Sequence, residues 1–377
     1  MSKIDVVHII TDLRRAGAEN MLAKLIEVMD AGRFQHTVVV LQDKGELGPR
    51  IEQAGARVIP LHMRGVFDLP RAVLQMRAFL KDTKPHIVQT WLYHADFVGT
   101  LAARAAGGSR LIWNVRCSNM NFRDYNPMTR MVCSLLARMS AVPDLVICNS
   151  LAGQKAHSEL GYHPRAWCLL PNGFDTERFR PDAGRSAAFR KSLEVGASTP
   201  LIGLPARLDP MKDQDNFLNA AVLLARDIPE ARFVLIGHGL DSDNAGIVER
   251  IAARGLDRRV HLLGERSDME TVMAGLDIVT LCSAYGEGFP NVLGEALSCG
   301  VLCVATDVGD SARVVGQHGR IISPRRPDDL AAAWRDILAL RPEIRKEMGM
   351  QGRQHVIEHY SLPAIGRAYE DLYTSLA

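Results

Sequence analysis

Residues 287–296 read Glu287-Gly288-Phe289-Pro290-Asn291-Val292-Leu293-Gly294-Glu295-Ala296 and place two carboxylates around the start of a predicted helix. Pro290 suits the first turn of that helix, where its missing N–H is not needed. A first turn leaves backbone N–H groups unpaired and carries a partial positive charge, which suits phosphate and sugar oxygens. Ionised carboxylates only accept hydrogen bonds and therefore suit hydroxyl groups. The stretch predicts a sugar nucleotide as ligand, although two carboxylates around a sugar could also be the acid and base of a glycosidase.

Outside this stretch, short apolar and β-branched runs alternate with helical patterns along the whole chain. Helix-like segments such as residues 18–29 and 69–81 separate most of these runs. The alternation predicts an α/β protein whose parallel sheets are covered by helices on both faces. The predicted strands are residues 6–10, 37–41, 57–60, 87–90, 111–115, 145–148 and 166–170 in the first half, and 201–204, 232–236, 260–263, 278–281, 302–305 and 319–322 in the second.

The length of 377 residues exceeds that of one ordinary core, so two domains are expected. Segments rich in proline and glycine bracket a short predicted helix within residues 179–199. We therefore predict two doubly wound domains, residues 1–180 and 181–359. Ligands of such sheets bind beyond the carboxyl ends of the strands, so the site is expected in a cleft between the two halves.

The composition, with 47% hydrophobic and 23% charged residues, is that of a soluble globular protein. No apolar run approaches the roughly 18–20 residues that a membrane span needs. The chain passes from Met1 into a short strand without the core of a signal peptide, which predicts a cytoplasmic protein. Its seven cysteines form no CxxC pair, which favours free thiols over disulfides or a zinc site.

The net charge of +2 is unevenly distributed, with +7 in residues 1–180 and −5 in residues 181–377. A basic first half would favour an acidic acceptor or an anionic membrane surface. A solvated surface with uneven charge explains the same numbers equally well. Both interpretations remain open on composition alone.

Four residues follow predicted strands at the positions where such sheets meet their ligands. Arg207 and Lys212 follow the strand at 201–204 and could together neutralise a diphosphate leaving group. Gly17 opens a predicted helix and would let the backbone approach an oxyanion. His94 follows the strand at 87–90 and could bind a sugar hydroxyl or carry a proton. An ordinary structural role is the alternative for each of the four.

Two other motifs are interpreted as turns. The run Gly237-His238-Gly239 begins like a dinucleotide fingerprint, but the position of the third glycine holds Ser242. Asp241 and Asp243 have the spacing of a metal-binding DxD, but the neighbouring glycines and Asn244 indicate a polar turn. Neither a dinucleotide site nor a metal site is therefore predicted.

Taken in order, these pieces resemble the family 4 glycosyltransferases, which are retaining enzymes of the GT-B fold. The resemblance covers essentially the whole chain, and its most specific element is Glu287 and Glu295 with seven residues between them. The further matching segments are residues 263–268, 277–283 and 306–310 in the second half, and 148–150, 171–175 and the His94 segment in the first.

The resemblance implies a role for each donor-site residue. Glu295 would hold the ribose of the donor nucleotide, and Glu287 the hydroxyls of the transferred sugar. Arg207 and Lys212 would hold the diphosphate. Gly17 matches the glycine loop that closes on the phosphates, although many members have a second glycine where this chain has Ala16. Sugar or phosphate oxygens would be bound by backbone groups of Gly288, Phe289, Pro290, Asn291 and Val292.

Catalysis would then rest on His94, Arg207, Lys212 and Glu287, with no protein nucleophile. Members of this fold need no catalytic metal, so neither a metal nor a cofactor is implied. Retention is explained by attack on the face that the departing phosphate occupies, with that phosphate helping to deprotonate the acceptor.

The resemblance assigns the acceptor to the first domain, which the C-terminal helix at residues 360–377 would join. Arg116 and Asn119 are the acceptor-binding candidates. Bacterial members often act on lipid-linked sugars at the inner face of the membrane, so a peripheral electrostatic attachment through the first domain is a hypothesis. Its basic residues are Arg64, Arg71, Arg77, Lys81, Lys84, Arg123 and Arg130.

The sequence thus predicts a metal-independent retaining glycosyltransferase that moves a sugar from a nucleoside diphosphate sugar, with uridine as the favoured base. The acceptor would be a glycan or a lipid-linked sugar in surface polysaccharide or glycolipid synthesis, and no nucleic acid partner is expected. The alternatives are a sugar-nucleotide epimerase or hydrolase of the same fold, or a protein that binds sugar nucleotides without turnover.

Overall fold

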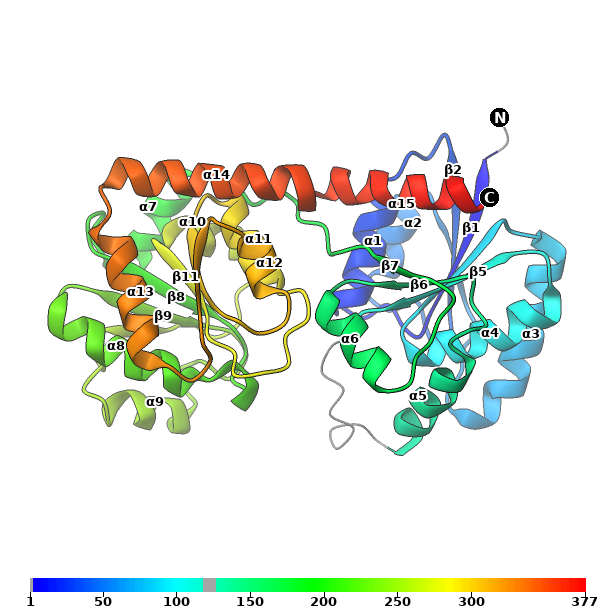
Figure 1. The fold of residues 1–377 in the computed structure, drawn as a ribbon, viewed down its shortest axis with the longest axis horizontal. Helices are drawn as coiled ribbons and strands as arrows, with labels where there is room; N and C mark the ends of the chain where they lie inside the picture. The colour runs from blue at the N-terminus through cyan, green and yellow to red at the C-terminus, as the bar shows by residue number, and fades with distance from the viewer. Residues whose placement is uncertain (1–2, 118–126) are drawn as a thin grey trace. The chain divides into compact units, whose positions relative to one another are not determined.

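The computed structural model describes residues 3–117 and 127–377, so Asn119 and Arg123 lie outside the described part of the chain. The chain divides into two compact units (Figure 1). Unit 1 comprises Met1–Gly173 and Leu362–Ala377, and unit 2 comprises Phe174–Ser361. Each unit contains one all-parallel sheet between helices, which confirms the predicted α/β class with two doubly wound sheets.

The sheet of unit 1 has seven parallel strands in the order β3-β2-β1-β4-β5-β6-β7. Every strand predicted in the first half is present, with bounds that differ by a few residues at most. The strands are β1 (Ile4–Ile10), β2 (Phe34–Val40), β3 (Arg57–Pro60), β4 (Ile87–Trp91), β5 (Arg110–Val115), β6 (Leu145–Cys148) and β7 (Trp167–Leu169). The helices are α1 (Gly17–Val28), α2 (Gly48–Gln53), η1 (Val66–Asp68), α3 (Leu69–Thr83), α4 (Tyr93–Ala106), α5 (Pro127–Met139), α6 (Leu151–Glu159) and α15 (Leu362–Leu376).

Apolar side chains fill both faces of this sheet, because successive strand residues point to opposite sides. On one face α1 packs beside the C-terminal helix α15, whose Tyr369 and Tyr373 are fully buried (Figure 1). Asn114 Nδ2 donates a hydrogen bond of 3.1 Å to Tyr369 Oη, and Tyr373 Oη donates to Gln89 Oε1. The last helix of the chain is therefore built into the core of unit 1. Helices α3, α4 and α5 cover the other face.

The sheet of unit 2 has six parallel strands in the order β10-β9-β8-β11-β12-β13, again at the predicted positions. The strands are β8 (Leu201–Pro205), β9 (Arg232–Ile236), β10 (Val260–Leu262), β11 (Ile278–Leu281), β12 (Leu302–Thr306) and β13 (Gly319–Ile322). The helices are α7 (Ala183–Ser192), η3 (Pro210–Lys212), α8 (Gln214–Asp227), α9 (Ala245–Ala252), α10 (Met269–Gly275), α11 (Asn291–Ser298), α12 (Ser311–Val315), α13 (Pro327–Ala339) and α14 (Pro342–Tyr360).

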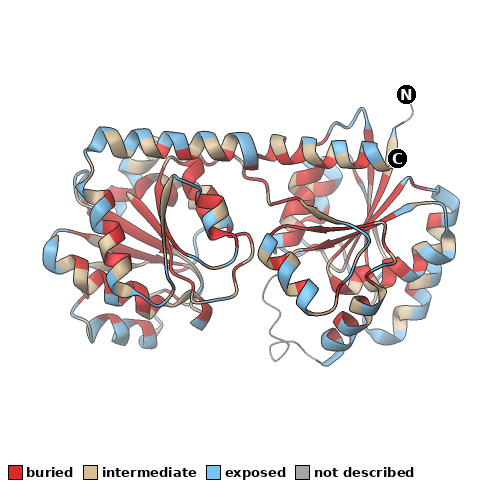
Figure 2. Cartoon of the chain, viewed as in Figure 1, coloured by how far each residue is buried: buried red, intermediate tan, exposed pale blue. Residues whose placement is uncertain are grey.

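The central strands of unit 2 are buried on both faces (Figure 2), and aromatic rings fill the space between the sheet and α8 and α13. Trp334 of α13 packs edge-on against Phe217 at a centroid distance of 5.1 Å. Its indole Nε1 donates a hydrogen bond of 2.9 Å to Thr280 Oγ1 of β11. A buried indole N–H with a partner fixes the register of helix and strand.

The contact boundary lies after Gly173, earlier than the proline- and glycine-rich segment that suggested residue 180. Phe174 stacks on Phe289 of unit 2 at 5.9 Å, and its backbone N–H bonds to Tyr360 O at 2.7 Å. A Cβ on Gly294 would lie 2.1 Å from the Phe174 ring, so only glycine lets α11 pack there. These contacts place residues 174–180 in unit 2.

The seven cysteines all lie in the described residues, and none of them is recorded in a disulfide. Among the described residues, no helix combines the length and the apolar character that crossing a membrane requires.

Candidate functional site

The loop after β8 carries Arg207 and Lys212, and a tight turn from the neighbouring strand supports it. Ala206 N bonds to Ile236 O, and Leu208 N to His238 O, at 2.8 Å each. Gly237, with φ +142°, lies so close that a Cβ there would be 2.3 Å from Ala206 O. The Gly237-His238-Gly239 turn thus positions the Arg207 loop, a role that its resemblance to a nucleotide fingerprint did not reveal.

Arg207 and Lys212 differ sharply in environment. The Arg207 side chain is 57% exposed and pairs with Asp209 at 2.7 Å. Lys212 ends η3, its side chain is only 14% exposed, and its Nζ lies 2.5 Å from Glu287 Oε1. The structure therefore brings Lys212 and Glu287 together, although they are far apart in the sequence. Arg207 stays at the surface and pairs with the carboxylate of Asp209 in the same loop.

The Glu287 carboxylate is nearly buried, with 8% of its side chain exposed. Ser283 Oγ, which follows the end of β11, donates to the same Oε1 at 2.5 Å. Thr306 Oγ1, at the end of β12, donates to Ser283 O at 2.7 Å and holds that loop in place. No described residue bonds Glu287 Oε2. The carboxylate is thus oriented by two donors on one oxygen, while the other oxygen can accept from a ligand hydroxyl.

The turn from Gly288 to Val292 is fixed from both sides. Asp310 N bonds to Gly288 O at 2.8 Å, and a Cβ on Gly309, with φ +63°, would lie 2.4 Å from Glu287 O. Phe289 is buried in the core of unit 2, between Phe174 and Tyr360, so only its backbone can serve a ligand.

Helix α11 begins at Asn291, with Pro290 at its N-cap. Glu295 follows in the second turn and is half-buried. The first turn of such a helix offers N–H groups and a partial positive charge to an anion. The loops after β8, β11 and β12 and this helix start therefore gather at the carboxyl edge of one sheet, where ligands of such sheets bind.

In unit 1, Gly17 opens α1 and is exposed. A Cβ at Gly17 would meet no atom within 4 Å, so the packing of unit 1 does not require glycine at this position. Two residues further on, Glu19 is buried, and burial raises the pKa of its carboxyl. No sequence pattern pointed to Glu19. Buried carboxyls with raised pKa values cluster at functional sites, so Glu19 is a second candidate site residue next to Gly17.

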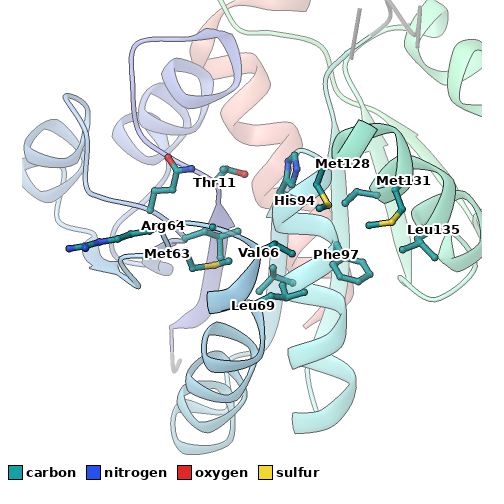
Figure 3. Close-up of a pocket in the computed structure, with 15 residues that line it drawn as sticks. Thr11, Met63, Arg64, Val66, Leu69, His94, Phe97, Met128, Met131 and Leu135 are labelled. Carbon is teal, nitrogen blue, oxygen red and sulfur yellow. The ribbon is translucent and has the colours of Figure 1, made fainter. Parts of the chain in front are cut away.

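His94 is the second residue of α4 and follows Leu92, whose φ of +69° is unusual for a branched side chain. The imidazole is half-buried, and burial lowers its pKa below the ordinary value, so it is neutral near pH 7. His94 lines a cavity of about 350 Å³ in unit 1 (Figure 3). A neutral imidazole can accept a proton or a hydrogen bond from a hydroxyl group in that cavity.

Arg116 is engaged by its own unit. Its guanidinium donates to Asn114 Oδ1 at 3.2 Å, to Tyr369 Oη at 3.4 Å and to Asn172 Oδ1, and its Cζ lies 5.4 Å from the centre of the Trp91 ring. These contacts tie the end of β5 to α15. The acceptor-binding role of Arg116 stays a prediction, as does that of Asn119 outside the described residues.

The described residues contain no group of three or more His, Cys, Asp and Glu side chains that could hold a metal ion. Asp241 and Asp243 form the predicted polar turn, in which Asp243 N bonds to Asp241 Oδ1 at 3.1 Å, just before α9.

Comparison with protein families gives a match to each half of the chain. Residues 15–178 match the family described as Glycosyltransferase Family 4, and residues 186–355 match the family described as Glycosyl transferases group 1. The two matches together span both units.

Three individual proteins illustrate the similarity. The chain is 29% identical to a GDP-mannose-dependent monoacylated alpha-(1-6)-phosphatidylinositol monomannoside mannosyltransferase of Corynebacterium glutamicum, over 58% of either chain. It is 23% identical to a UDP-Gal:alpha-D-GlcNAc-diphosphoundecaprenol alpha-1,3-galactosyltransferase of Escherichia coli, over 81% of this chain and 80% of the relative. Among solved structures, Anabaena HepE in complex with UDP matches with a TM-score of 0.83 at 21% identity, over 99% of this chain and 100% of HepE. At 21% identity, the match to HepE is evidence for a shared fold alone.

Proposed function

The chain is a family 4 glycosyltransferase of the GT-B fold, and we propose that it moves a sugar from a nucleoside diphosphate sugar to its acceptor with retention of configuration. The observation that carries this proposal is the Lys212–Glu287–Ser283 cluster beside the start of α11. A cation, an oriented carboxylate and a helix N-terminus suit phosphate and sugar groups of one donor.

In this proposal each group has one task. Lys212 and Arg207 neutralise the diphosphate as the glycosyl bond breaks, together with the N–H groups of the first turn of α11. Glu287 accepts a hydrogen bond from a hydroxyl of the transferred sugar through Oε2, and Glu295 accepts from the ribose. The departing phosphate takes the acceptor proton, and no protein nucleophile or metal takes part. His94 contacts the sugar or the acceptor hydroxyl.

The donor base is proposed to be uridine. The HepE structure contains UDP and the relative from Escherichia coli is named for UDP-galactose, whereas the relative from Corynebacterium glutamicum is named for GDP-mannose. A thermal-shift panel of UDP-, GDP- and ADP-linked sugars would test the base and the sugar in one experiment. Stabilisation by a GDP-sugar alone would refute the proposed base.

For the acceptor we propose a glycan or lipid-linked sugar of surface polysaccharide or glycolipid synthesis, reached from the inner face of the membrane. The names of the two relatives include a phosphatidylinositol mannoside and a diphosphoundecaprenol. Arg71, Lys81 and Lys84 lie exposed on α3 and at its end, close in sequence to Phe67 and Leu74, which are 97% and 61% exposed. Such a mixed basic and apolar surface suits an anionic membrane. Equal recovery with neutral and anionic liposomes in flotation, at low and high salt, would refute electrostatic attachment.

Release of nucleotide from the donor, measured with and without a lipid-linked acceptor, tests the activity itself. Lys212→Ala and Glu295→Ala should abolish turnover while the fold is kept. Lys346→Ala and Glu343→Ala, at exposed positions of α14, are the matched controls and should retain it. Release that does not need acceptor would indicate a hydrolase. Donor binding without any release would indicate a binding protein, and full activity in both site variants would refute the assigned site.

A further inference from the structure

The cavity beside His94 lies at the carboxyl ends of the first strands of unit 1 (Figure 3). Its walls come from Thr11 after β1, Leu41 and Gln42 after β2, the segment 63–66 after β3, and the helices α3, α4 and α5. Its volume of about 350 Å³ lies within the range of roughly 300–1,000 Å³ that small-molecule sites occupy. The edge of the sheet at which ligands of this fold class bind therefore already holds a ligand-sized space.

The lining is polar at one end and apolar elsewhere. Thr11 and His94 lie together at one side, while Leu69 and Phe97 lie across from them, and Met128, Met131 and Leu135 of α5 follow along the wall (Figure 3). Methionine side chains adapt their shape to flexible apolar ligands. The arrangement suits a molecule with a hydroxyl-bearing end and a hydrocarbon body.

The described lining carries almost no charge. Among the residues that the structure describes, the ionisable side chains of the lining are Arg64 and His94. Arg64 extends away from the cavity (Figure 3), and burial keeps His94 uncharged near pH 7. An ionic group placed among these walls would lose its hydration without gaining a partner, which is costly. The interior is therefore complementary to an uncharged occupant.

The apolar wall continues outward to the surface. Val66, Met128 and Met131 line the cavity and are nevertheless 50%, 40% and 51% exposed. Large apolar side chains clustered around an opening mark a place where an apolar ligand enters or leaves. A ring-shaped ligand would end inside the cavity, whereas a chain can extend past this rim.

We propose that this cavity binds a hydrocarbon chain of the acceptor, with the hydroxyl-bearing end of the acceptor beside Thr11 and His94. The assignment of that chain to the acceptor rests on the proposed function. The presence of a hydrocarbon-binding site in unit 1 does not rest on the proposed function, because it is inferred from the volume and the apolar lining of the cavity. The substrate class is accordingly an amphiphile, and a free sugar would leave most of the cavity unfilled.

The test uses n-alkyl β-D-glucosides with four to ten carbons, below their micelle concentrations, titrated into the full chain by calorimetry without donor. Affinity should rise about fourfold with each added methylene until the cavity is full. Met131→Glu places a charge at the rim, and Leu135→Trp fills the interior. Both should weaken binding of the octyl glucoside at least about tenfold. Met350→Glu changes a methionine of similar exposure, 45%, on α14 of unit 2 and should leave binding unchanged.

Binding that does not depend on chain length would overturn the proposal. Chain-length dependence that persists in both Met131→Glu and Leu135→Trp would overturn it too, because the chain would then bind elsewhere. Circular dichroism checks that each variant is folded. Met131→Glu changes the rim and Leu135→Trp changes the interior, so if one variant misfolds the other still tests the proposal. Donor binding is proposed to rest on Lys212, Glu287 and Glu295 of unit 2 and is measured by thermal shift with donor alone, so failure of the alkyl series and failure of the proposed glycosyl transfer are distinguishable.

Discussion

Replacing Lys212 by methionine removes the cation that faces Glu287 while keeping most of the apolar stem. Breaking a fully buried ion pair from one side costs about 3–5 kcal/mol, because a buried charge is left without its partner. Here the side chains are 14% and 8% exposed, and Glu287 keeps its hydrogen bond from Ser283. We therefore expect Lys212→Met to destabilise unit 2 by about 2–3 kcal/mol. Arg207→Met breaks a pair whose cation is 57% exposed and should cost less than about 1 kcal/mol.

The two units need a probe that separates their unfolding, because one transition cannot be assumed for the whole chain. Trp334 is the single tryptophan of unit 2 and is fully buried, whereas Trp91, Trp113 and Trp167 belong to unit 1. Urea unfolding followed by ¹⁹F NMR of protein labelled with 5-fluorotryptophan therefore reports unit 2 through one resonance.

A double-mutant cycle with Glu287→Gln isolates the interaction between Lys212 and Glu287. The coupling should exceed about 1.5 kcal/mol if the pair is as close and as buried as described. Equal destabilisation by Lys212→Met and Arg207→Met, together with a coupling near zero, would refute the reasoning. Lys212 would then be an ordinary surface cation.

Four further predictions concern single positions. Ser283→Ala removes a hydrogen bond to a carboxylate, and the loss of a bond to a charged group is worth about 1.5–3 kcal/mol. It should lower kcat/KM about 10- to 100-fold, while the Trp334 transition stays cooperative and shows that unit 2 remains folded. Unchanged kinetics would contradict the positioning of Glu287. Gly309→Ala adds a Cβ 2.4 Å from Glu287 O at positive φ and should destabilise unit 2 by more than about 1 kcal/mol in the same urea experiment. Gly17→Ala meets no atom and should leave stability unchanged, so any loss of turnover in a donor assay would come from the approach of the ligand. Burial lowers the pKa of His36 to about 4, below an unfolded value of about 6.5, so the unfolded state binds more protons between these values. Unit 1 should therefore lose about 1.4 kcal/mol per unit as pH falls through this window, and His36→Gln should flatten the slope in urea titrations followed at Trp113; an unchanged slope would contradict it.

The strands could be predicted from the sequence because each is a short apolar run, often β-branched, between turn residues, as in the predicted strands at residues 232–236 and 302–305. The proposed donor residues could be selected because they follow predicted strands, where ligands of such sheets bind. The strand order was not predicted, and the pairing of β8 with β11 is what brings Lys212 close to Glu287. No sequence pattern, however, indicated that Ser283 donates to Glu287, because a serine in a loop has many possible orientations.

Arg116 shows a second limit. It follows β5 in a segment that suggested an acceptor contact, yet its partners include Tyr369, which is 253 residues further along the chain. Docking of the last helix onto unit 1 creates this environment. Local sequence carries no information about such a contact, because it depends on how α15 packs rather than on what surrounds Arg116 in the chain.

The same distinction separates the two candidate ligand sites. The proposed donor residues of unit 2 occupy the loops after β8 and β11 and the start of α11, and bonds within unit 2 hold Lys212, Ser283 and Glu287 in place. Such a site is preorganised, and small displacements would be costly to its chemistry. The cavity in unit 1 is assembled from side chains of three loops and three helices, and three of them are methionines, which repack at little cost. Substitutions along α5 should therefore change which acceptor is used more readily than they change how the donor is handled.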